Sequence, residues 1–537
     1  MKKTVVLVLL LFILLLGAGF RLWRLGANPP AMFRDEAEKG YTAWSLARTG
    51  GYLYFSGLPD RTELKFQKWP VFINVFGVYT SAAYQYCALP FVGLGGLKEA
   101  TTRVPAALSG ILTILVVFLL VWVWTDEPIP ALFSAFFLAV SPWHVLFSRW
   151  ALQGILLPLL VTMALLFFDY GLRHKPWQIV LSGVFFGCAF YTYEIGRLFV
   201  PLLLVCLVLV YRKPLWEKRK WSLAAGFIFA LITIPIFLYY ITGDRAERFN
   251  RLSIFSRDLQ FHKSLVLFVS NYLNHYSPSF LFLFGDAELR HSIPGMGMMY
   301  LFEAPLLLYG LWLLIQKGQP HHWILLCWFF LFPAGSSMTK EGIPHALRSI
   351  VALPMPQIIC GIAAASLFQT MSNVSRKEKF SRAFIIKILM ILILCVMGLN
   401  IFRMGRNLFL HYPADSALHW QYGIKQALHY VHKEKIAPDR VYISGYVTYA
   451  PYLVMFYDRL DPDMLREKGI NGLGYNFLPP GIPGIRLWER LPEGACLILY
   501  PGELQGVKPI HRIYCPRDSR KPQETPQPAL EIFMKKS

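Results

Sequence analysis

Charged residues are scarce in this chain. Only 16% of its 537 residues are charged, while 55% are hydrophobic; a soluble protein carries about 25% charged residues. Acidic residues are the rarer kind, with 32 against 53 basic residues and a formal net charge of +21. The shortage of charge argues against an ordinary soluble fold and indicates a bilayer as the main solvent. The excess of cations favours anionic partners such as lipid headgroups, phosphates or acidic glycans.

Motifs for metals and nucleotides are also missing. The chain has eight cysteines, no CxxC motif and no His-rich cluster, so no metal ligands are assigned. There is no P-loop, Gly-rich dinucleotide fingerprint or internal repeat. The cations are scattered between apolar runs, which makes nucleic acid a poor partner. Cys496 and Cys515, in the polar tail, could form one disulfide if that tail faces an oxidising space.

Long apolar segments, in contrast, are abundant. A helix needs about 20 mostly apolar residues to cross the hydrocarbon core, with about 17 as the lower limit. The sequence offers eleven candidates, at 4–20, 103–124, 129–147, 155–171, 177–194, 197–211, 222–241, 299–316, 322–335, 348–369 and 383–402. It therefore predicts an all-α membrane protein, a polytopic bundle of about eleven transmembrane helices with its termini on opposite sides.

The basic residues of short loops favour one orientation. With a cytoplasmic N-terminus, the densest basic clusters fall inside: Lys2 and Lys3, 173–175, 212–220 and 376–382. Four arginines between 245 and 257 would then lie outside, near phosphates or headgroups. We expect a multi-pass plasma-membrane protein with an extracytoplasmic C-terminal domain. If the first span were instead a cleaved signal peptide, residue 35 would stay on the same side.

Three segments lie outside the predicted spans. The first, 21–102, contains a polar helical stretch at 35–49 and an amphipathic stretch at 71–92 that is expected to lie in the membrane interface. The second, 242–298, is charged, aromatic and interrupted by prolines. We therefore predict a membrane module over 1–402 whose exterior loop 21–102 carries interfacial helices.

The third segment, 403–537, has the pattern of a small α/β domain. Residues 416–433 are helix-like, and 441–443 and 496–500 are typical of strands. The composition after about residue 517, rich in Lys, Pro and Gln, predicts a disordered end.

An acidic pair, Asp35 and Glu36, follows the first span, and Lys68 comes roughly thirty residues later. A carboxylate at a membrane surface can take a proton from an acceptor hydroxyl, while a lysine holds a phosphate. A local interpretation is also open. Asp35 could be the N-cap of a helix over 36–49 with Glu38 completing a capping box, Glu36 could complement the helix N-terminus or support Asp35, and Lys68 could reach for the interface.

With these residues the chain resembles the GT-C class of membrane glycosyltransferases, closest to the protein O-mannosyltransferase and aminoarabinose-transferase branch (glycosyltransferase family 39 and its bacterial relatives). The run Asp35-Glu36-Ala37 is similar to the acidic motif of the first exterior loop, and Lys68-Trp69-Pro70 to a Lys-Pro-Pro motif with Trp69 replacing the first proline. Residues 102–105 resemble an Arg-Leu-Pro segment, and 141–149 the second exterior turn. Gln153 stands where some relatives have an acidic residue, which argues against a second catalytic carboxylate there.

The resemblance covers roughly residues 1–400 and implies transfer of a hexose or pentose from a polyprenyl-phosphate carrier. The acceptor would be a lipid, glycan or protein hydroxyl on the extracytoplasmic face. Asp35 would act as general base, with Glu36 as its acidic partner. No cofactor is required, because cations can stabilise a singly phosphorylated leaving group; a divalent metal remains compatible.

Other polar residues are also candidates for the site. The donor-phosphate candidates are Lys68, Arg103, Arg149, Arg197, Lys340, His345 and Arg348. The candidates for acceptor contact or support are His144, Tyr193, Glu194, His275 and His291. Structural interpretations remain open for all of them: arginines that anchor span ends, a hydrogen-bonded interfacial histidine, an ion pair between Glu194 and Arg197, and residues that hold or solvate their own loops.

Two other functions compete with the enzyme. A transporter or flippase of lipid-linked sugars would also be multi-pass, but transporters often show repeat symmetry and midplane charges. The ionisable residues here gather instead in segments outside the spans. A non-catalytic scaffold presenting 403–537 is the third possibility.

Overall fold

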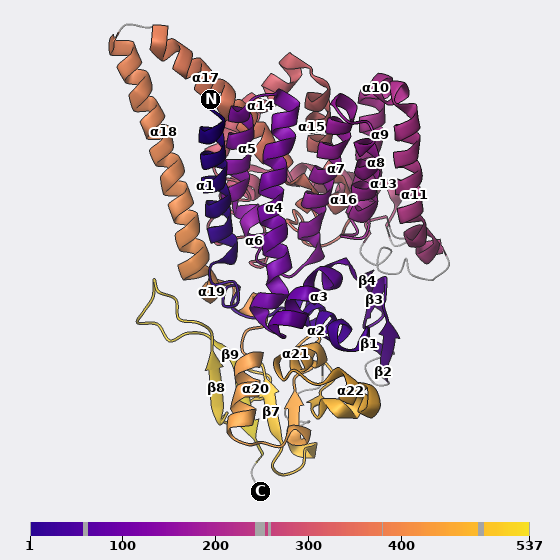
Figure 1. The fold of residues 1–537 in the computed structure, drawn as a ribbon. Helices are drawn as coiled ribbons and strands as arrows, with labels where there is room; N and C mark the ends of the chain where they lie inside the picture. Colours follow the sequence, from indigo (N-terminus) through magenta and orange to yellow (C-terminus); the bar gives the residue numbers. More distant parts are fainter. Residues whose placement is uncertain are drawn as a thin grey trace. The chain divides into compact units, whose positions relative to one another are not determined.

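Figure 1 shows the computed structural model of the chain, which describes residues 2–56, 63–241, 253–255, 259–377, 380–481 and 488–535. The chain divides into two compact units. The helical unit comprises Met1–Trp23, Ala106–Arg149 and Gln153–Asn407, and the mixed unit comprises Arg24–Pro105, Trp150–Leu152 and Leu408–Ser537. The four arginines between 245 and 257 fall outside the described residues.

The helical unit consists of helices only, among its described residues, apart from one isolated β-bridge between Ser253 and Thr339. Its longer helices are α1 (Lys3–Leu22), α4 (Glu99–Thr125, which begins in the mixed unit), α5 (Pro128–Val140), α7 (Leu156–Arg173), α8 (Gln178–Ala189), α9 (Gly196–Val210), α11 (Arg219–Ile241), α13 (Phe261–Asn274), α14 (Glu303–Lys317), α15 (Pro320–Leu331), α17 (Met355–Lys377) and α18 (Phe380–Arg406). Its short helices are α6 (Pro142–Phe147), α10 (Arg212–Glu217) and α16 (Ala334–Ser337).

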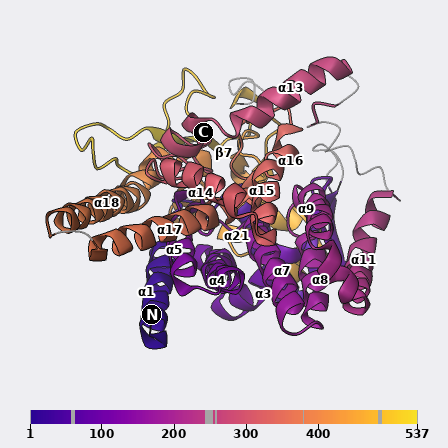
Figure 2. The same ribbon diagram turned by 90° about the horizontal axis from the view of Figure 1, so that it is seen from above.

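Small residues let these helices approach closely. Helix α8 packs between α7 and α11, and α17 packs against α5 and α14 (Figure 2). A Cβ added to Gly183 would lie 2.4 Å from the carbonyl oxygen of Ala225, and one added to Gly361 would lie 2.2 Å from the hydroxyl of Ser134. Close contact at small residues is how helices associate when lipid offers no hydrophobic driving force between them.

The apolar surface of this unit suits a bilayer. Among the described residues, six helices are long and apolar enough to cross a membrane: Lys3–Leu22, Glu99–Thr125, Gln153–Arg173, Arg219–Tyr239, Ile350–Asn373 and Met390–Asp415. Three shorter apolar helices add to them, at Pro128–Val140, Gln178–Ala189 and Gly196–Val210. Leu7, Leu223, Phe227 and Leu399 are largely exposed, as expected for side chains that face lipid.

Each of the eleven predicted spans contains a helix, but the span at 129–147 is broken. Helix α5 ends at Val140 and α6 begins at Pro142. The break has a local cause, because Pro142 cannot donate to the preceding turn. Ser141 then caps α6 by accepting a hydrogen bond from His144 N at 3.4 Å.

The mixed unit combines two hairpins, a sheet and short helices. Before α4 it contains α2 (Arg34–Thr49), β1 (Gly51–Ser56), β2 (Glu63–Lys68), β3 (Phe72–Val75), β4 (Val78–Ser81) and α3 (Ala83–Gly95). After the helical unit it contains α19 (Tyr412–Asp415), α20 (Ile424–Lys433), β5 (Val441–Ile443), α21 (Ala450–Tyr457), α22 (Pro462–Lys468), β6 (Asn476–Phe477), β7 (Cys496–Leu499), β8 (His511–Tyr514) and β9 (Pro528–Met534).

The amphipathic stretch 71–92 was predicted as an interfacial helix, and only its second half is helical. Its first half is the β3–β4 hairpin, in which Val75 pairs with Val78. The two residues between the strands, Phe76 and Gly77, both have positive φ, 49° and 82°. This is the backbone of the tight turn that matches the twist of a hairpin, and a hydrophobicity pattern cannot reveal it.

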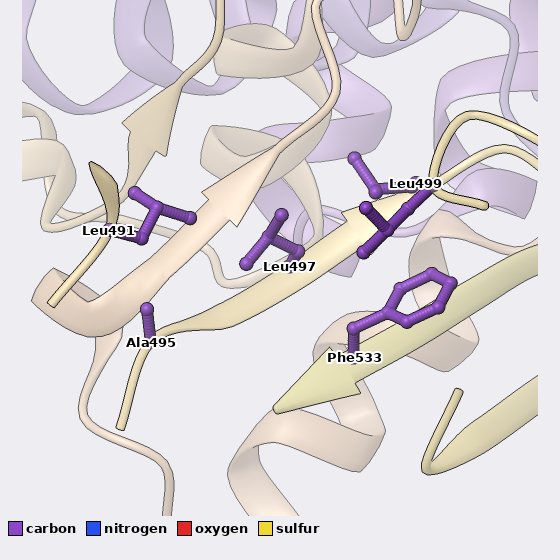
Figure 3. Close-up of a cluster of buried hydrophobic side chains, with 6 residues drawn as sticks. Leu491, Ala495, Leu497, Leu499 and Phe533 are labelled. Carbon is purple, nitrogen blue, oxygen red and sulfur yellow. The ribbon is translucent and has the colours of Figure 1, made fainter. Parts of the chain in front are cut away.

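The C-terminal sheet has the strand order β6-β5-β7-β9-β8. Strand β5 runs parallel to β6 and β7, whereas β9 is antiparallel to β7 and β8. On one side of the sheet, Leu491, Ala495, Leu497, Leu499 and Phe533 form a buried cluster (Figure 3). The predicted strands at 441–443 and 496–500 are therefore present.

The prediction of a disordered end after about residue 517 is wrong. Residues Pro528–Met534 form β9, which lies between two other strands and buries Ala529, Leu530, Ile532 and Phe533. The prediction followed the polar composition of 517–527 and missed the short apolar strand after it, which is stabilised by pairing with β7 and β8. Cys496 and Cys515 are both free thiols, so the proposed disulfide is absent from the structure.

Residues of the tail pack directly on the first segment of the mixed unit. The hydroxyl of Tyr41 on α2 donates to the carbonyl of Leu460 at 2.7 Å. The rings of Phe55 on β1 and Tyr452 on α21 meet edge to face, with centroids 5.1 Å apart. Helix α2 is therefore held by a backbone carbonyl 419 residues away in sequence.

Candidate active site

Helix α2 carries the acidic pair and begins two residues earlier than a cap at Asp35 would require. The helix starts at Arg34 after Phe33, and the backbone N–H of Phe33 donates to Oε2 of Glu36 at 3.2 Å. Glu36 thus makes the return bond of a capping box. The alternative of Asp35 as N-cap, with Glu38 completing the box, is wrong, and Asp35 lies within the first helical turn.

Glu36 is completely buried and its two oxygens accept four hydrogen bonds. Nε of Arg103 donates to Oε1 at 2.9 Å and Nη2 donates to Oε2 at 2.8 Å. The backbone N–H of Ala151 donates to Oε1 at 2.8 Å, and that of Phe33 to Oε2. Such a two-point ion pair fixes orientation as well as charge. Glu36 therefore anchors the start of α2 and has no free acceptor for a substrate.

Arg103 is equally occupied, although its assignment as a phosphate ligand stays a prediction. Besides Glu36, it donates to the carbonyl oxygens of Leu25 at 3.2 Å, Pro29 at 2.9 Å and Ala31 at 2.6 Å. These five bonds use all five guanidinium N–H groups. The indole of Trp420 lies 5.9 Å from the guanidinium carbon. Arg103 thus fixes the backbone of the segment that leads into α2.

The carboxylate of Asp35 is in a different position. Its side chain is 36% exposed, and its nearest cation is Nε of Arg34 at 3.9 Å, too far for a hydrogen bond. Among the described residues this is its one ion-pair contact. Asp35 is therefore a half-exposed acid on a rigid helical turn, adjacent to a buried acid that is fully engaged.

The tail sets the surroundings of Asp35 through Arg34. The backbone N–H of Arg34 donates to Oε1 of Gln421 at 3.0 Å, and its Nη1 donates to Oγ1 of Thr448 at 2.7 Å. The guanidinium also lies 5.0 Å from the ring centre of Tyr449. The C-terminal segment thus supplies partners to the residue that immediately precedes the candidate base.

A second polar group lies one turn further along α2. The carboxylate of Glu38 accepts hydrogen bonds from Thr42 and Gln85, each at 3.1 Å, and lies 3.5 Å from Nζ of Lys39. Burial raises the pKa of Glu38 despite the nearby Lys39. Nζ of Lys39 also lies 3.5 Å from the carbonyl of Asp35. Sequence reasoning overlooked Lys39, although its position four residues after Asp35 was a usable signal.

Lys68 is the last residue of β2, where it pairs with Gly51, and its side chain is exposed. Trp69, which replaces a proline of the resembled motif, has φ of 38° and is exposed as well. Among the described residues no ion pair joins Lys68 to Asp35. Lys68 belongs to the same unit as Asp35 and keeps an accessible ammonium group.

In the helical unit, Arg149 and His144 serve the fold. Buried Arg149 donates through Nη1 to the carbonyl oxygens of Phe20 and Arg21, at 2.8 and 3.1 Å, and through Nη2 to that of Trp23 at 2.8 Å. His144 is buried and its Nδ1 lies 2.7 Å from Nη2 of Arg21. Both residues secure the end of α1, and the roles of Arg149 as a phosphate ligand and of His144 as an acceptor contact stay predictions.

The group Tyr193, Glu194 and Arg197 lies at the turn from α8 into α9. All three side chains are partly buried. Nε of Arg197 donates to the carbonyl of Phe190 at 3.3 Å. Arg197 is thus tied to the preceding helix end, while the chain reverses between two apolar helices.

The loop between α16 and α17 joins several predicted residues. Nη1 of Arg348 donates to Oγ1 of Thr339 and to the carbonyl of Glu341, both at 2.7 Å, whereas the side chain of Lys340 is exposed. Nδ1 of His345 accepts the backbone N–H of Arg348 at 3.3 Å. The loop is held by its own bonds and presents Lys340 outward.

His275 is a structural residue beside this loop. Its Nδ1 lies 2.7 Å from the carbonyl of Asn271 and its Nε2 lies 2.8 Å from Oγ of Ser336. Nδ1 therefore carries the proton in this network, and both ring nitrogens are used. Burial lowers the pKa of His275 to about 4, so the ring is neutral at physiological pH. His291 lies close by, with Nδ1 3.0 Å from Oδ2 of Asp286.

The structure thus sorts the predicted residues into two groups. Asp35, Glu36, Lys68 and Arg103 belong to the mixed unit; all the others belong to the helical unit, where His275, His291, His345 and Arg348 share one neighbourhood.

Comparison with known proteins supports the resemblance. Residues 83–240 match the family described as dolichyl-phosphate-mannose-protein mannosyltransferase. No curated protein sequence matches the chain.

Solved structures are similar over nearly the whole chain. ArnT from Cupriavidus metallidurans in the apo state is 16% identical, with 96% of this chain and 97% of that chain covered and a TM-score of 0.53. The same protein bound to undecaprenyl phosphate is 14% identical with the same coverage and a TM-score of 0.51. The apo oligosaccharyltransferase of Archaeoglobus fulgidus is 13% identical, covering 93% of this chain and 70% of that chain, with a TM-score of 0.53.

These likenesses confirm the prediction of a multi-pass membrane protein with the GT-C glycosyltransferase fold. At such identities the structural likeness establishes the fold alone. The matched family adds support for a glycosyl-transfer enzyme that uses a lipid-linked sugar.

Proposed function

We propose that this chain, with its GT-C glycosyltransferase fold, moves a sugar from a polyprenyl-phosphate carrier to an acceptor hydroxyl, with Asp35 as the general base. The reaction would take place on the extracytoplasmic face of the plasma membrane, with the N-terminus cytoplasmic and residues 403–537 outside. The single observation that carries the proposal is the contrast between two adjacent acids. Glu36 is buried and fully hydrogen-bonded, whereas Asp35 is half-exposed with only a distant ion pair.

This arrangement suits base catalysis. A general base must be held in place yet keep a lone pair for the acceptor proton. The Glu36–Arg103 pair fixes the first turn of α2, and the tail fixes Arg34, so the backbone of Asp35 is held from both sides. Glu36 then has a positioning role and does not itself exchange a proton.

The leaving group calls for cations. A phosphate released from a lipid-linked sugar carries charge that lysine or arginine can stabilise. Lys68 remains the candidate in the mixed unit because its ammonium is exposed, and Lys340, Arg197 and Arg348 remain candidates in the helical unit. ArnT has been solved with undecaprenyl phosphate, which supports a carrier of this class for the present chain.

The test is donor turnover by the purified, membrane-reconstituted chain. A panel of polyprenyl-phosphate hexoses and pentoses, each with a labelled sugar, is offered with lipid, glycan and peptide acceptors. We expect Asp35→Asn to lower kcat by about 10²-fold or more while donor binding changes little, because the amide keeps the shape of the carboxylate but cannot accept the proton.

Asp463→Asn is the matched control, since it removes the same charge from an exposed position of the same unit. It is expected to retain normal kcat. Turnover by Asp35→Asn at the unmodified rate would refute the base assignment. Movement of labelled donor across the proteoliposome membrane without bond cleavage would favour the flippase alternative.

A further inference from the structure

A carboxylate and two imidazoles meet in the helical unit. Oδ2 of Asp286 lies 3.0 Å from Nδ1 of His291 and 4.0 Å from Nδ1 of His345. The two imidazole rings are 4.6 Å apart, centre to centre. One ligand atom from each of the three side chains lies within 4.8 Å of the others. The residues come from two distant segments, one before α14 and one before α17.

The ligand atoms already make hydrogen bonds that a cation would replace. Nδ1 of His291 lies 3.0 Å from Oδ2 of Asp286, and Nδ1 of His345 accepts the backbone N–H of Arg348 at 3.3 Å. A metal binds a carboxylate and imidazole nitrogens that carry no proton, so its binding would displace the proton shared by Asp286 and His291 and the contact with Arg348.

Hydrogen bonds from backbone N–H groups and a serine hydroxyl also hold Asp286 in place. Oδ1 of Asp286 accepts the backbone N–H of Glu288 at 2.9 Å, and Oδ2 accepts that of Ala346 at 2.8 Å. The hydroxyl of Ser292 donates to the Asp286 carbonyl at 2.6 Å. Supporting bonds of this kind orient the ligands in metal sites, and here they involve both segments that supply the ligands.

We propose that Asp286, His291 and His345 bind one divalent cation of borderline softness, with zinc the best match. Two imidazoles and a carboxylate are typical zinc ligands, and three protein ligands leave one position of a tetrahedron for water. Magnesium and calcium would require mostly oxygen ligands, which this group does not supply.

The geometry needs only a small adjustment. Ligand bonds of about 2.0–2.2 Å place tetrahedral ligand atoms roughly 3.3 Å apart. Asp286 and His291 are already near that separation, so His345 has the most to move. Its side chain is 14% exposed, against 7% for His291 and 6% for Asp286, so it is also the ligand with most room. The ion would join the segment before α14 to the loop that carries Arg348.

The experiment uses the full-length chain in detergent after chelator treatment. Zinc is titrated calorimetrically, with magnesium titrated separately. We expect one zinc per chain, bound at least tenfold more tightly than magnesium, and a higher Tm when zinc is present. Failure to bind zinc more tightly than magnesium would overturn the proposal, whatever the transferase assay shows.

Variants test which residues bind. His345→Ala and His291→Ala are expected to lose at least tenfold in zinc affinity, while His262→Ala, an exposed histidine of the same unit, is expected to bind normally. A melting curve without metal verifies that each variant is folded; should His291→Ala fail to fold, His345→Ala alone decides. Unchanged zinc affinity in folded His345→Ala would contradict the assignment.

Cobalt identifies the donor atoms. The eight free cysteines could also bind zinc. The proposed site predicts visible absorption of tetrahedral cobalt without a sulfur-to-cobalt charge-transfer band, lost in His345→Ala. A strong charge-transfer band that persists in that variant would place the ion on cysteines and overturn the proposal.

Discussion

Two buried carboxylates of this protein have opposite kinds of partner. Glu36 in the mixed unit is paired with an arginine that uses all five of its N–H groups, whereas Asp286 in the helical unit faces two imidazoles. Each also accepts a backbone N–H from a distant segment, Ala151 and Ala346 respectively. An arginine saturates a carboxylate with fixed donors and closes the site. Imidazole nitrogens can exchange their hydrogen bonds for a cation, so the second group has the chemistry of a metal-ligand set and the first does not.

The largest effect is expected from breaking the saturated pair. Arg103→Met leaves the Glu36 carboxylate buried without its cation and orphans three carbonyl oxygens. Loss of one partner from such a pair costs about 3–5 kcal/mol. Chemical denaturation of the purified variant, followed by the fluorescence of its tryptophans, measures the loss.

Lys521→Met is its control, because Lys521 forms an exposed pair with Glu524 and such pairs contribute at most about 1 kcal/mol. Equal stabilities of the two variants would mean that the Glu36–Arg103 pair does not hold the fold.

A smaller loss of folding stability is expected at low pH, through the buried histidines of the helical unit. The pKa of His275 falls from 6.5 unfolded to about 4 folded, so the unfolded chain binds more protons between these values. Stability is then full above about pH 6.5 and declines as the pH falls toward 4. Between pH 7 and pH 5 the loss is roughly 2 kcal/mol, and His345 acts in the same direction.

The measurement is unfolding free energy against pH for the metal-free protein and for His275→Gln. The glutamine variant should show a shallower decline over that window. An identical slope in both proteins would exclude His275 as a source of acid sensitivity.

The smallest effect is expected at Lys68, an exposed cation that contacts neither Glu36 nor Asp286. Lys68→Gln removes an exposed point charge and is expected to raise the donor KM about five- to tenfold with little change in kcat, equivalent to roughly 1 kcal/mol. The difference should shrink at high salt, which screens exposed charges.

Lys65→Gln provides the comparison, since residues 65 and 68 of one strand point to opposite faces. Similar donor KM values for the two variants would remove Lys68 from the donor site.

Local pattern revealed much of the fold. Runs of apolar residues located a helix within every predicted span, and short apolar runs located the strands predicted at 441–443 and 496–500, the second of which ends at Leu499. The errors came where structure depends on a partner. Strand β9 exists because β7 and β8 flank it, and the β3–β4 hairpin depends on positive φ at Phe76 and Gly77.

The site was predicted less completely, for the same reason. The motif around Asp35 was visible, but nothing in the sequence showed that Glu36 is buried and fully hydrogen-bonded, because Arg103 and Ala151 contact it from far along the chain. Arg149 stood at a span end like a ligand-binding arginine, and only its bonds to three carbonyl oxygens show that it anchors α1.

The sequence by itself determined that this protein lies in a membrane, since hydropathy over about 20 residues is a local quantity that needs no partner. It also determined where a carboxylate follows the first span. Only the tertiary structure decided which charges are used up inside the protein and which stay available, because a buried charge is satisfied by groups brought together from distant segments, and their meeting is not encoded in any one segment.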